Sequence, residues 1–291
     1  MDVIHTISEL RTHLKRERDN GKSISFISTM GALHAGHISL VEHGKSISDI
    51  TVAGIFLNPS HFAEGEDYDK YPRTLETDCS KLEAVRCDIV FAPSVKEIYP
   101  LGLDYQATVD VPFLSEQFCG KTRPHFFSAI ATVVTKLLNI VQPDFSLFGE
   151  KDFQQLAVCR RLVETLNIPT QVIGVPTIRD DSGLALSSRN GYLNDAEREQ
   201  ASHLYQVLLN AKRKILERSS TYSTIESESI EALTRFGFKP DYFSFADALT
   251  LEPASDATTD IVILCAAYLD SVRLIDNIVV SKEKTGASTA I

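Results

Sequence analysis

The sequence predicts an α/β fold, with a doubly wound parallel sheet and a smaller C-terminal α+β domain. Three observations favour this class. Apolar strand-like runs alternate with helix-like segments as far as Val175, polar residues follow several of these runs directly, and the pattern changes after Pro176. Alternating strands and helices are typical of parallel sheets with right-handed crossovers. We expect one domain at 1–178 and a second at 179–291.

The elements of the first domain follow from apolar periodicity and from Gly and Pro stops. Thr6 and Glu9 form a capping box before an amphipathic helix that ends near Gly21. Strands are predicted at 23–29, 50–56, 88–92, 145–148 and 170–175, and helices from 37, at 74–86, at 127–141 and at 152–166.

The second domain begins with a polar loop, 179–190. Asn194, with Glu197 three residues later, predicts a capped helix. Two apolar runs, 241–245 and 261–267, predict strands. Together these features indicate a smaller α+β domain.

Composition excludes several classes of protein. A net charge of −10 disfavours a nucleic-acid-binding protein, which needs a basic face. The five cysteines include no C-x-x-C pair, so neither a zinc site nor a disulfide framework is indicated. The N-terminus has no apolar signal-peptide core, and the longest clean apolar run, 261–269, is too short to cross a bilayer. We expect a cytoplasmic chain that does not bind membranes.

The first candidate site lies where the strand at 23–29 turns into a helix, in Met30 to His37. A helix N-terminus offers free N–H groups and the positive end of a dipole, which suit phosphate. His34 and His37 can add donors, and Gly31 and Gly36 permit close backbone approach to a ligand. The alternatives are a zinc site, for which no third ligand is suitably spaced, and two ordinary surface histidines.

Three further segments carry polar residues near predicted strand ends or in the loop between the domains. Lys151, within Gly149 to Gln155, is placed to stabilise charge on a transferring phosphoryl group, but it is also typical of a solvated lysine. Leu186 to Asn190 suits phosphate binding, or is a solvated linker. Asn58-Pro59 followed by His61 is a site or a plain turn. Cys119 to Thr122 resembles the end of a P-loop, but Pro124 breaks the helix that should follow.

The order and spacing of these segments resemble the pantothenate synthetase family. The motifs that carry the resemblance are T-M-G-A-L-H-A-G-H, N-P-x-x-F, Y-P-R-T, F-A-P-S, R-P with a following H-F, G-E-K-D-F-Q-Q, D-S-G-L-A-L-S-S-R-N-x-Y-L and R-L-I-D-N. They cover most of the first domain and both ends of the second. Members belong to the HIGH-motif nucleotidyltransferases with a Rossmann-like domain, and the resemblance implies a homodimer whose C-terminal domain acts as a lid.

The resemblance implies a residue for each role. His37, His34 and Lys151 would be catalytic, with His37 as acid or phosphate ligand. Asp78 matches one acidic position near Mg²⁺, although the neighbouring position is Thr77. His61 and Gln155 would bind pantoate and β-alanine. The residues implied for ATP are Met30, Gly31, Ala32, Leu33, His34, Ala35, Gly36, His37, Gly149, Glu150, Lys151, Asp152, Ile178, Leu186, Ser187, Ser188 and Arg189.

Two departures from the family pattern fall in or near the acid pocket. His61 stands where members carry glutamine, and Phe126 stands where a histidine is usual, beside His125. The implied reaction is adenylation of pantoate by ATP, then attack by β-alanine with release of AMP. Two alternatives stay open: another nucleotidyltransferase of the superfamily, and a non-catalytic relative that binds ATP without turnover.

Overall fold

The computed structural model describes residues 1–62 and 65–282, so most of the tail after Val280 lies outside the described residues. The chain divides into two compact units. Unit 1 comprises Met1–Ile178 and Leu186–Ser188, and unit 2 comprises Arg179–Ala185 and the chain from Arg189 onward. The polar loop predicted at 179–190 is therefore shared between the two units.

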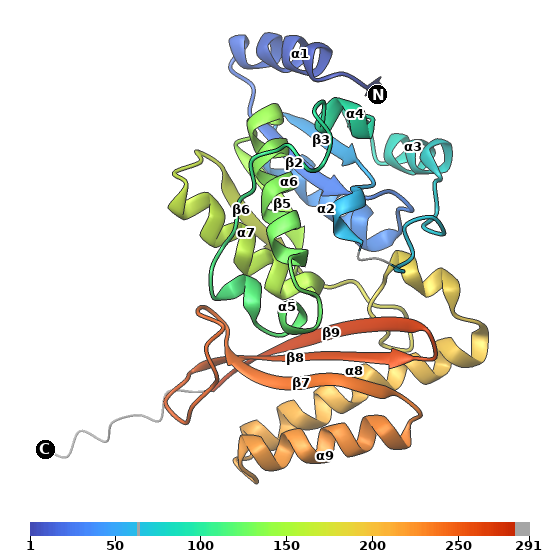
Figure 1. The fold of residues 1–291 in the computed structure, drawn as a ribbon, viewed down its shortest axis with the longest axis vertical. Coiled ribbons are helices and arrows are strands. Elements are labelled where there is room, and N and C mark those ends of the chain that lie inside the picture. The colour runs from blue at the N-terminus through green and yellow to red at the C-terminus, as the bar shows by residue number, and fades with distance from the viewer. Residues whose placement is uncertain (63–64, 283–291) are drawn as a thin grey trace, which may run out of the picture. The chain divides into compact units, whose positions relative to one another are not determined.

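Unit 1 is built on a six-stranded parallel sheet, which confirms the predicted doubly wound class (Figure 1). Its strand order is β1-β4-β3-β2-β5-β6. The strands are β1 (Asp2–Ile4), β2 (Ile24–Thr29), β3 (Ile50–Ile55), β4 (Ile89–Phe91), β5 (Phe145–Gly149) and β6 (Gln171–Val175). The helices are α1 (Ile7–Asp19), α2 (Ala35–Ile47), α3 (Leu75–Ala84), α4 (Val95–Ile98), α5 (Cys119–Thr122), α6 (Phe126–Val141) and α7 (Phe153–Thr165).

The strand order determines which face each long helix covers. From β2 the chain steps to β3 and then β4 in one direction, whereas the steps β1 to β2, β4 to β5 and β5 to β6 run the other way. Right-handed crossovers therefore place α2 and α3 on one face and α1, α6 and α7 on the other. Contacts between α2 and α3, and from α6 to both α1 and α7, agree with this division.

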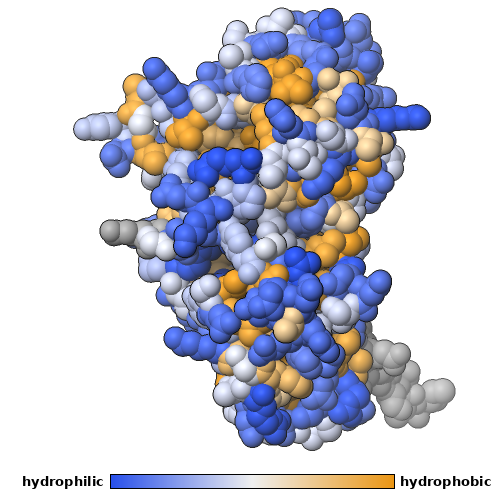
Figure 2. Space-filling model, turned by 90° about the vertical axis from the view of Figure 1, so that its right-hand side faces the viewer, coloured by the Kyte–Doolittle hydropathy of each residue, from blue (hydrophilic) through white to orange (hydrophobic). Residues whose placement is uncertain are grey.

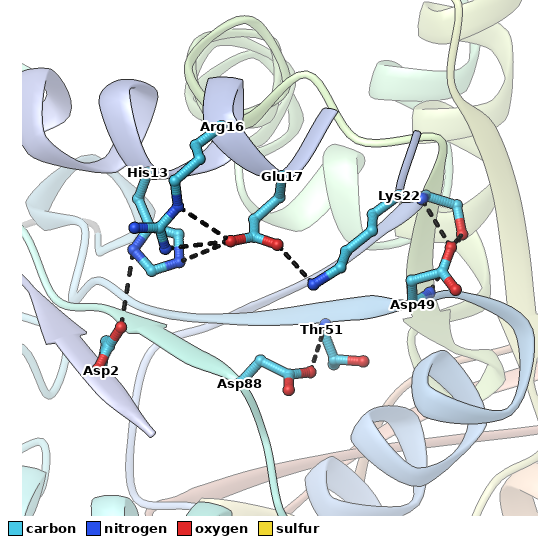
Figure 3. Close-up of polar contacts among 9 residues, drawn as sticks. Asp2, His13, Arg16, Glu17, Lys22, Asp49, Thr51 and Asp88 are labelled. Carbon is cyan, nitrogen blue, oxygen red and sulfur yellow. Dashed lines mark hydrogen bonds and ion pairs between the residues drawn. The ribbon is translucent and has the colours of Figure 1, made fainter. Parts of the chain in front are cut away.

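Carboxylates reinforce the amino edge of the sheet. Asp49, Asp88 and Asp144 each directly precede a strand, and each accepts a backbone N–H from, or just before, a neighbouring strand. Figure 3 shows Asp49 and Asp88 in this role, the latter against Thr51. Glu17 of α1 lies nearby and pairs with Lys22 at 2.7 Å, and this bond lowers the pKa of Glu17. Charges at this edge pair with one another, at the end of the sheet opposite the predicted site.

Unit 2 contains the predicted smaller α+β arrangement. An antiparallel sheet is formed by β7 (Lys239–Asp247), β8 (Asp260–Leu269) and β9 (Val272–Ser281) in sequence order. Helices α8 (Asp195–Leu216) and α9 (Tyr222–Arg235) share a core with its strands. The capping box of Asn194 and Glu197 is present at the start of α8, as predicted.

On the face drawn in Figure 2, hydrophilic residues surround smaller groups of apolar ones, as the charged fraction of 23% suggests. Among the described residues, no helix combines the length and apolar character needed to cross a membrane. All five cysteines are free thiols.

Candidate active site

The two segments with the strongest predicted nucleotide motifs follow neighbouring strands. Met30 to His37 comes directly after β2, and the 3-10 turn Glu150–Asp152 comes directly after β5. β2 pairs with β5 from Ser25↔Phe145 to Ile27↔Leu147. From these two strands the chain continues in opposite directions across the sheet. Ligands in open α/β sheets bind at such a switch point, at the carboxyl ends of the strands.

His34 and His37 cap the start of α2 with their own side chains. Nδ1 of His34 accepts the Gly36 N–H at 3.1 Å, and Nδ1 of His37 accepts the His34 N–H at 3.3 Å. The two rings lie 4.0 Å apart between centroids. Because Nδ1 is an acceptor in both rings, a neutral ring carries its proton on Nε2. Each histidine therefore has one N–H donor left for a ligand.

Both histidines are neutral at physiological pH. Burial, aided by the charge of Lys151, lowers the pKa of His34 to about 4. Burial, followed by the neighbouring His34 and then Lys151, lowers the pKa of His37 to about 3. Donation from Nε2 is therefore the role that this environment favours.

Lys151 reaches the histidines from the neighbouring strand. Its charge contributes to the lowered pKa of both His34 and His37. Its side chain is 17% exposed and lies 3.9 Å from the Asp152 carboxylate, which is itself 49% exposed. The structure thus brings the lysine of one predicted motif to the histidines of the other.

The turn before the histidines is held from α3. Gly31 and Ala32 both have positive φ, 83° and 51°, and the Asp78 carboxylate accepts the N–H groups of Ala32 and Leu33. Lys81, one turn further along α3, donates to the Leu33 carbonyl at 2.5 Å. Asp78 was predicted only as a residue near the metal, and its contact with this turn spans 46 residues of sequence.

The predicted phosphate loop contributes to unit 1 through three residues. Ser188 Oγ donates to the Ala32 carbonyl at 3.0 Å, and the Leu186 N–H donates to the Ile178 carbonyl at 3.0 Å. Ser187 lies between them, whereas Arg189 belongs to unit 2. The loop therefore reaches the turn that precedes the histidines.

A cavity of about 470 Å³ opens after β3. Asn58 lies beside it: its Oδ1 accepts from Tyr99 Oη at 3.0 Å, while its Nδ2 is buried with no acceptor among the described residues. A buried donor without an acceptor is costly, so this amide is a candidate donor to a ligand or water oxygen. The cavity is lined by Ser60, His61, Phe62, Tyr99, Gln106, Thr108, Arg123, Pro124, His125, Phe126, Ser128, Ala129 and Thr132.

The two residues that depart from the family pattern meet in this cavity. His61 and Phe126 pack edge to face, with ring centroids 6.2 Å apart. Arg123 lies over the Phe126 ring at 3.6 Å and donates to the His61 carbonyl at 2.9 Å. Glu66 binds the same guanidinium at 2.9 and 2.7 Å. Phe126 thus packs against Arg123, which the sequence indicated only as part of the R-P motif.

Gln155, the other predicted acid-binding residue, lies half-buried on α7 and does not line this cavity as described. Its neighbour Gln154, which we did not single out, is 5% exposed and binds three backbone groups of residues 114–119. Among the described residues, no group of three or more His, Cys, Asp or Glu side chains is placed to hold a metal ion.

Comparison with known proteins gives consistent results. A family model described as pantoate-beta-alanine ligase matches residues 2–279. The chain is 49% identical to the pantothenate synthetase of Marinobacter nauticus over 282 residues, which is 97% of this chain and all of that protein. It is also 49% identical to that of Azotobacter vinelandii, covering 96% of this chain and 98% of the relative.

Two crystal structures extend the likeness to the fold. Pantothenate synthetase from Thermus thermophilus superposes with a TM-score of 0.89 at 40% identity, covering 96% of this chain and 99% of that one. Pantoate-beta-alanine ligase from Francisella tularensis, described as complexed with beta-gamma ATP and beta-alanine, gives 0.80 at 33% identity, with 96% and 97% covered. With the histidine turn, the lysine and the cavity at one sheet edge, these matches establish that the chain belongs to the pantoate–β-alanine ligase family, the pantothenate synthetases.

Proposed function

We propose that this enzyme joins pantoate to β-alanine through a pantoyl-adenylate, with release of AMP and pyrophosphate. The observation that carries the proposal is the meeting of His34, His37 and Lys151 at the switch point of the sheet. Two neutral N–H donors and a cation there suit the phosphates of a nucleotide. The Francisella relative, described with a β-γ ATP ligand, supports ATP as the substrate.

The first step activates a carboxylate that has a poor leaving group. A pantoate carboxylate oxygen attacks the α-phosphorus of ATP, an O–P bond forms, and the bond to the β-phosphate breaks so that pyrophosphate leaves. Lys151 and the Nε2–H groups of His34 and His37 offset negative charge on the phosphate oxygens. Ile178, Gly149, Glu150, Asp152 and the loop Leu186 to Arg189 are proposed to complete the nucleotide site.

In the second step, the neutral amine of β-alanine attacks the acyl carbon. An amide bond forms, the proton lost by the amine passes to solvent, and AMP leaves with the oxygen that bridged carbon and phosphorus. No covalent intermediate with a protein nucleophile is needed. We attribute much of the rate to positioning the two reactants and to keeping water from the mixed anhydride.

The cavity after β3 is the proposed acid pocket. His61 and Asn58 line or border it, and Asn58 Nδ2 offers a donor for a substrate oxygen. Arg123 supplies a positive charge for a carboxylate, although Glu66 already pairs with it. Gln155 is proposed to bind pantoate from α7. The likeness to a relative described with β-alanine supports an amino acid as second substrate.

Magnesium, a homodimer and a cytoplasmic location complete the proposal, all on the resemblance to the family. Mg²⁺ prefers oxygen ligands and usually keeps several waters while bound by substrate phosphates and one or two carboxylates. Asp78 is the residue to test as such a carboxylate. Its oxygens accept the N–H groups of Ala32 and Leu33, which limits what they can offer a metal ion.

The experiment is a substrate-omission assay of the purified protein. AMP release is expected only when ATP, pantoate and β-alanine are all present, with one pantothenate formed per AMP. Nucleotide retained on an acid product would favour another nucleotidyltransferase. ATP binding without product under any combination would favour a non-catalytic relative.

A further inference from the structure

Asp78 is a wholly buried carboxylate whose oxygens are already engaged. Oδ1 accepts the Leu33 N–H at 2.8 Å, and Oδ2 accepts the Ala32 N–H at 2.9 Å. Thr74 Oγ1 donates a third bond to Oδ2 at 3.1 Å. The residue has no exposed surface. Of the two lone pairs on each oxygen, both on Oδ2 and one on Oδ1 are therefore used within the protein.

The turn that Asp78 holds is strained. Gly31 and Ala32 are consecutive residues in the left-handed region, with φ of 83° and 51°. That conformation is unfavourable for alanine and persists only where surrounding contacts impose it. A Cβ at Gly31 would lie 3.2 Å from Asp78 Oδ2, a tight contact, so the carboxylate also disfavours a side chain there. Lys81 of the same helix binds the Leu33 carbonyl, so α3 holds Leu33 through both its backbone polar groups.

These contacts do not fit a metal ligand. Mg²⁺ requires near-octahedral oxygen ligands at about 2.0–2.1 Å and gives up its waters reluctantly. Asp78 offers one lone pair and no accessible surface, and the adjacent residue is Thr77. Among the described residues it belongs to no group of three or more His, Cys, Asp or Glu side chains that could hold a metal ion. The two N–H groups of the turn also face Asp78, so they are not directed at a phosphate.

We propose that Asp78 is a positioning residue that fixes the turn Gly31–Leu33, and not a ligand of magnesium. By holding this turn it sets where α2 begins, and so where His34 and His37 present their Nε2–H groups. The metal would then be held by the nucleotide phosphates and water. This inference rests on the proposed nucleotide site at α2.

The test compares ATP binding by the wild type and Asp78→Asn, each with and without Mg²⁺. Asparagine keeps the size of the side chain but places an N–H₂ group against a backbone N–H donor. We expect ATP affinity to fall about tenfold in both conditions, since bonds to a charged acceptor are lost. The ratio of the affinities with and without Mg²⁺ should stay within about twofold of the wild-type ratio.

A metal ligand would behave in the opposite way. Removing its negative charge from beside the phosphates would leave metal-free ATP binding unchanged or tighter, while the gain from Mg²⁺ would shrink. That outcome would overturn the proposal, as would unchanged binding in both conditions. Thr74→Val is the matched control. It removes the third bond but keeps both backbone contacts, so it should shift metal-free ATP affinity by much less than Asp78→Asn.

A measurement on the wild-type protein decides the question if Asp78→Asn does not fold. The amide hydrogens of Ala32 and Leu33 should exchange slowly without nucleotide, and adding Mg²⁺ alone should not change their rates. Fast exchange, or protection that depends on Mg²⁺, would overturn the proposal. Amide exchange tests the role of Asp78, and the substrate-omission assay tests the proposed function. Because the two measurements are independent, either proposal can fail while the other holds.

Discussion

Lys151 connects the two strand ends that form the proposed nucleotide site. It extends from the turn after β5, and its charge lowers the pKa of His34 and His37 after β2. Lys151→Ala should lower pyrophosphate exchange by about a hundredfold, as loss of a charge-stabilising donor does elsewhere. Lys96→Ala, at an exposed position of α4, should leave exchange near the wild-type rate. Near-wild-type exchange by a folded Lys151→Ala protein would refute this role.

The two neutral histidines make stability depend on pH. An unfolded histidine has a pKa of about 6.5, whereas the folded values are about 4 for His34 and about 3 for His37. Below the unfolded pKa, the unfolded chain binds protons that the folded chain does not. The free energy of unfolding should therefore fall, by on the order of a few kcal/mol, as pH drops from about 7 to about 4.

Denaturant titrations at several pH values measure this loss of stability. The double variant His34→Gln, His37→Gln removes both titrating rings, so its unfolding free energy should change less over the same pH range. If the slopes of the wild type and the double variant agree, the histidines are not the source of the dependence.

We predict a separate pH dependence in substrate binding, which arises from His61. Neutral imidazole matches an amide in having one donor and one acceptor, and the charged ring adds a donor and a positive charge suited to the pantoate carboxylate. Pantoate affinity should strengthen as His61 gains a proton, and His61→Gln should flatten that profile while leaving an active enzyme. Among the described residues, the other basic side chains that line this cavity are Arg123, which pairs with Glu66, and His125.

His125→Gln is the matched control, since His125 lines the same cavity but follows Pro124 in a left-handed conformation. Its pantoate profile should keep the wild-type shape. Pantoate binding with one pH profile in wild type and His61→Gln would mean that His61 does not contact the acid.

At the scale of single residues, the sequence predicted contiguous motifs but not the contacts between distant residues. The turn, lysine and loop motifs were readable because each is contiguous in sequence. The bond of Asp78 to Ala32 and that of Arg123 to His61 span 46 and 62 residues, so no local pattern predicts them. The resemblance indicated Asp78 by position alone, without the partners that determine its role.

At the scale of elements, Gln154 of α7 holds the backbone of residues 114–119, which precede the proposed acid pocket. Its Nε2 donates to Leu114 O at 2.8 Å and Gln117 O at 2.7 Å, and its Oε1 accepts the Cys119 N–H at 3.2 Å. Phe118 lies between these contacts at a positive φ of 42°. One buried amide thus satisfies three backbone groups of a segment with little regular structure, just before Arg123.

Gln154→Ala leaves those backbone groups without partners. Unfolding free energy should fall by about 2 kcal/mol, and KM for pantoate should rise more than KM for ATP. Gln155→Ala, one position along α7, should raise KM for pantoate with little change in stability. Equal stability of Gln154→Ala and the wild type in denaturant titration would contradict the assigned role.

The elements with a clear apolar run were predicted well, including the three-residue β4 within 88–92, whereas β1 and the weakly patterned α9 and β9 were not predicted. Strands β2, β3 and β5 match their predicted runs to within about two residues, as expected for element boundaries. β1 has three residues, too few to show a period. α9 was missed because serine, threonine and glutamate interrupt its apolar stripe, and β9 because its R-L-I-D-N segment was interpreted only as a motif.

For the whole molecule, the sequence predicted a polar loop at 179–190 but not which of its residues belong to each unit. Arg179 pairs with the buried Asp276 carboxylate of unit 2 at 2.6 Å, while Ser188 bonds to Ala32 of unit 1. A contiguous sequence gives no sign that residues 186–188 return to the first unit. The proposed lid role of 179–291 depends on movement of this loop.

We predict that the loop becomes more ordered when ATP binds. Backbone hydrogen exchange of Leu186 to Arg189 should slow at saturating ATP, whereas exchange in α9 should not change. Ser188→Ala removes the bond to Ala32, so it should speed exchange of the loop in the nucleotide-free protein. Unchanged loop exchange at saturating ATP would count against a lid.

The central claim is that ATP activates pantoate by transfer of its adenylyl group. Pantoate labelled with ¹⁸O in both carboxylate oxygens tests it most directly, by mass spectrometry of the products. Attack on the α-phosphorus followed by displacement at carbon leaves one ¹⁸O in AMP and one in the new amide. We predict one labelled oxygen in each AMP and none in pyrophosphate. Unlabelled AMP, or label recovered in inorganic phosphate with ADP as co-product, would contradict the account.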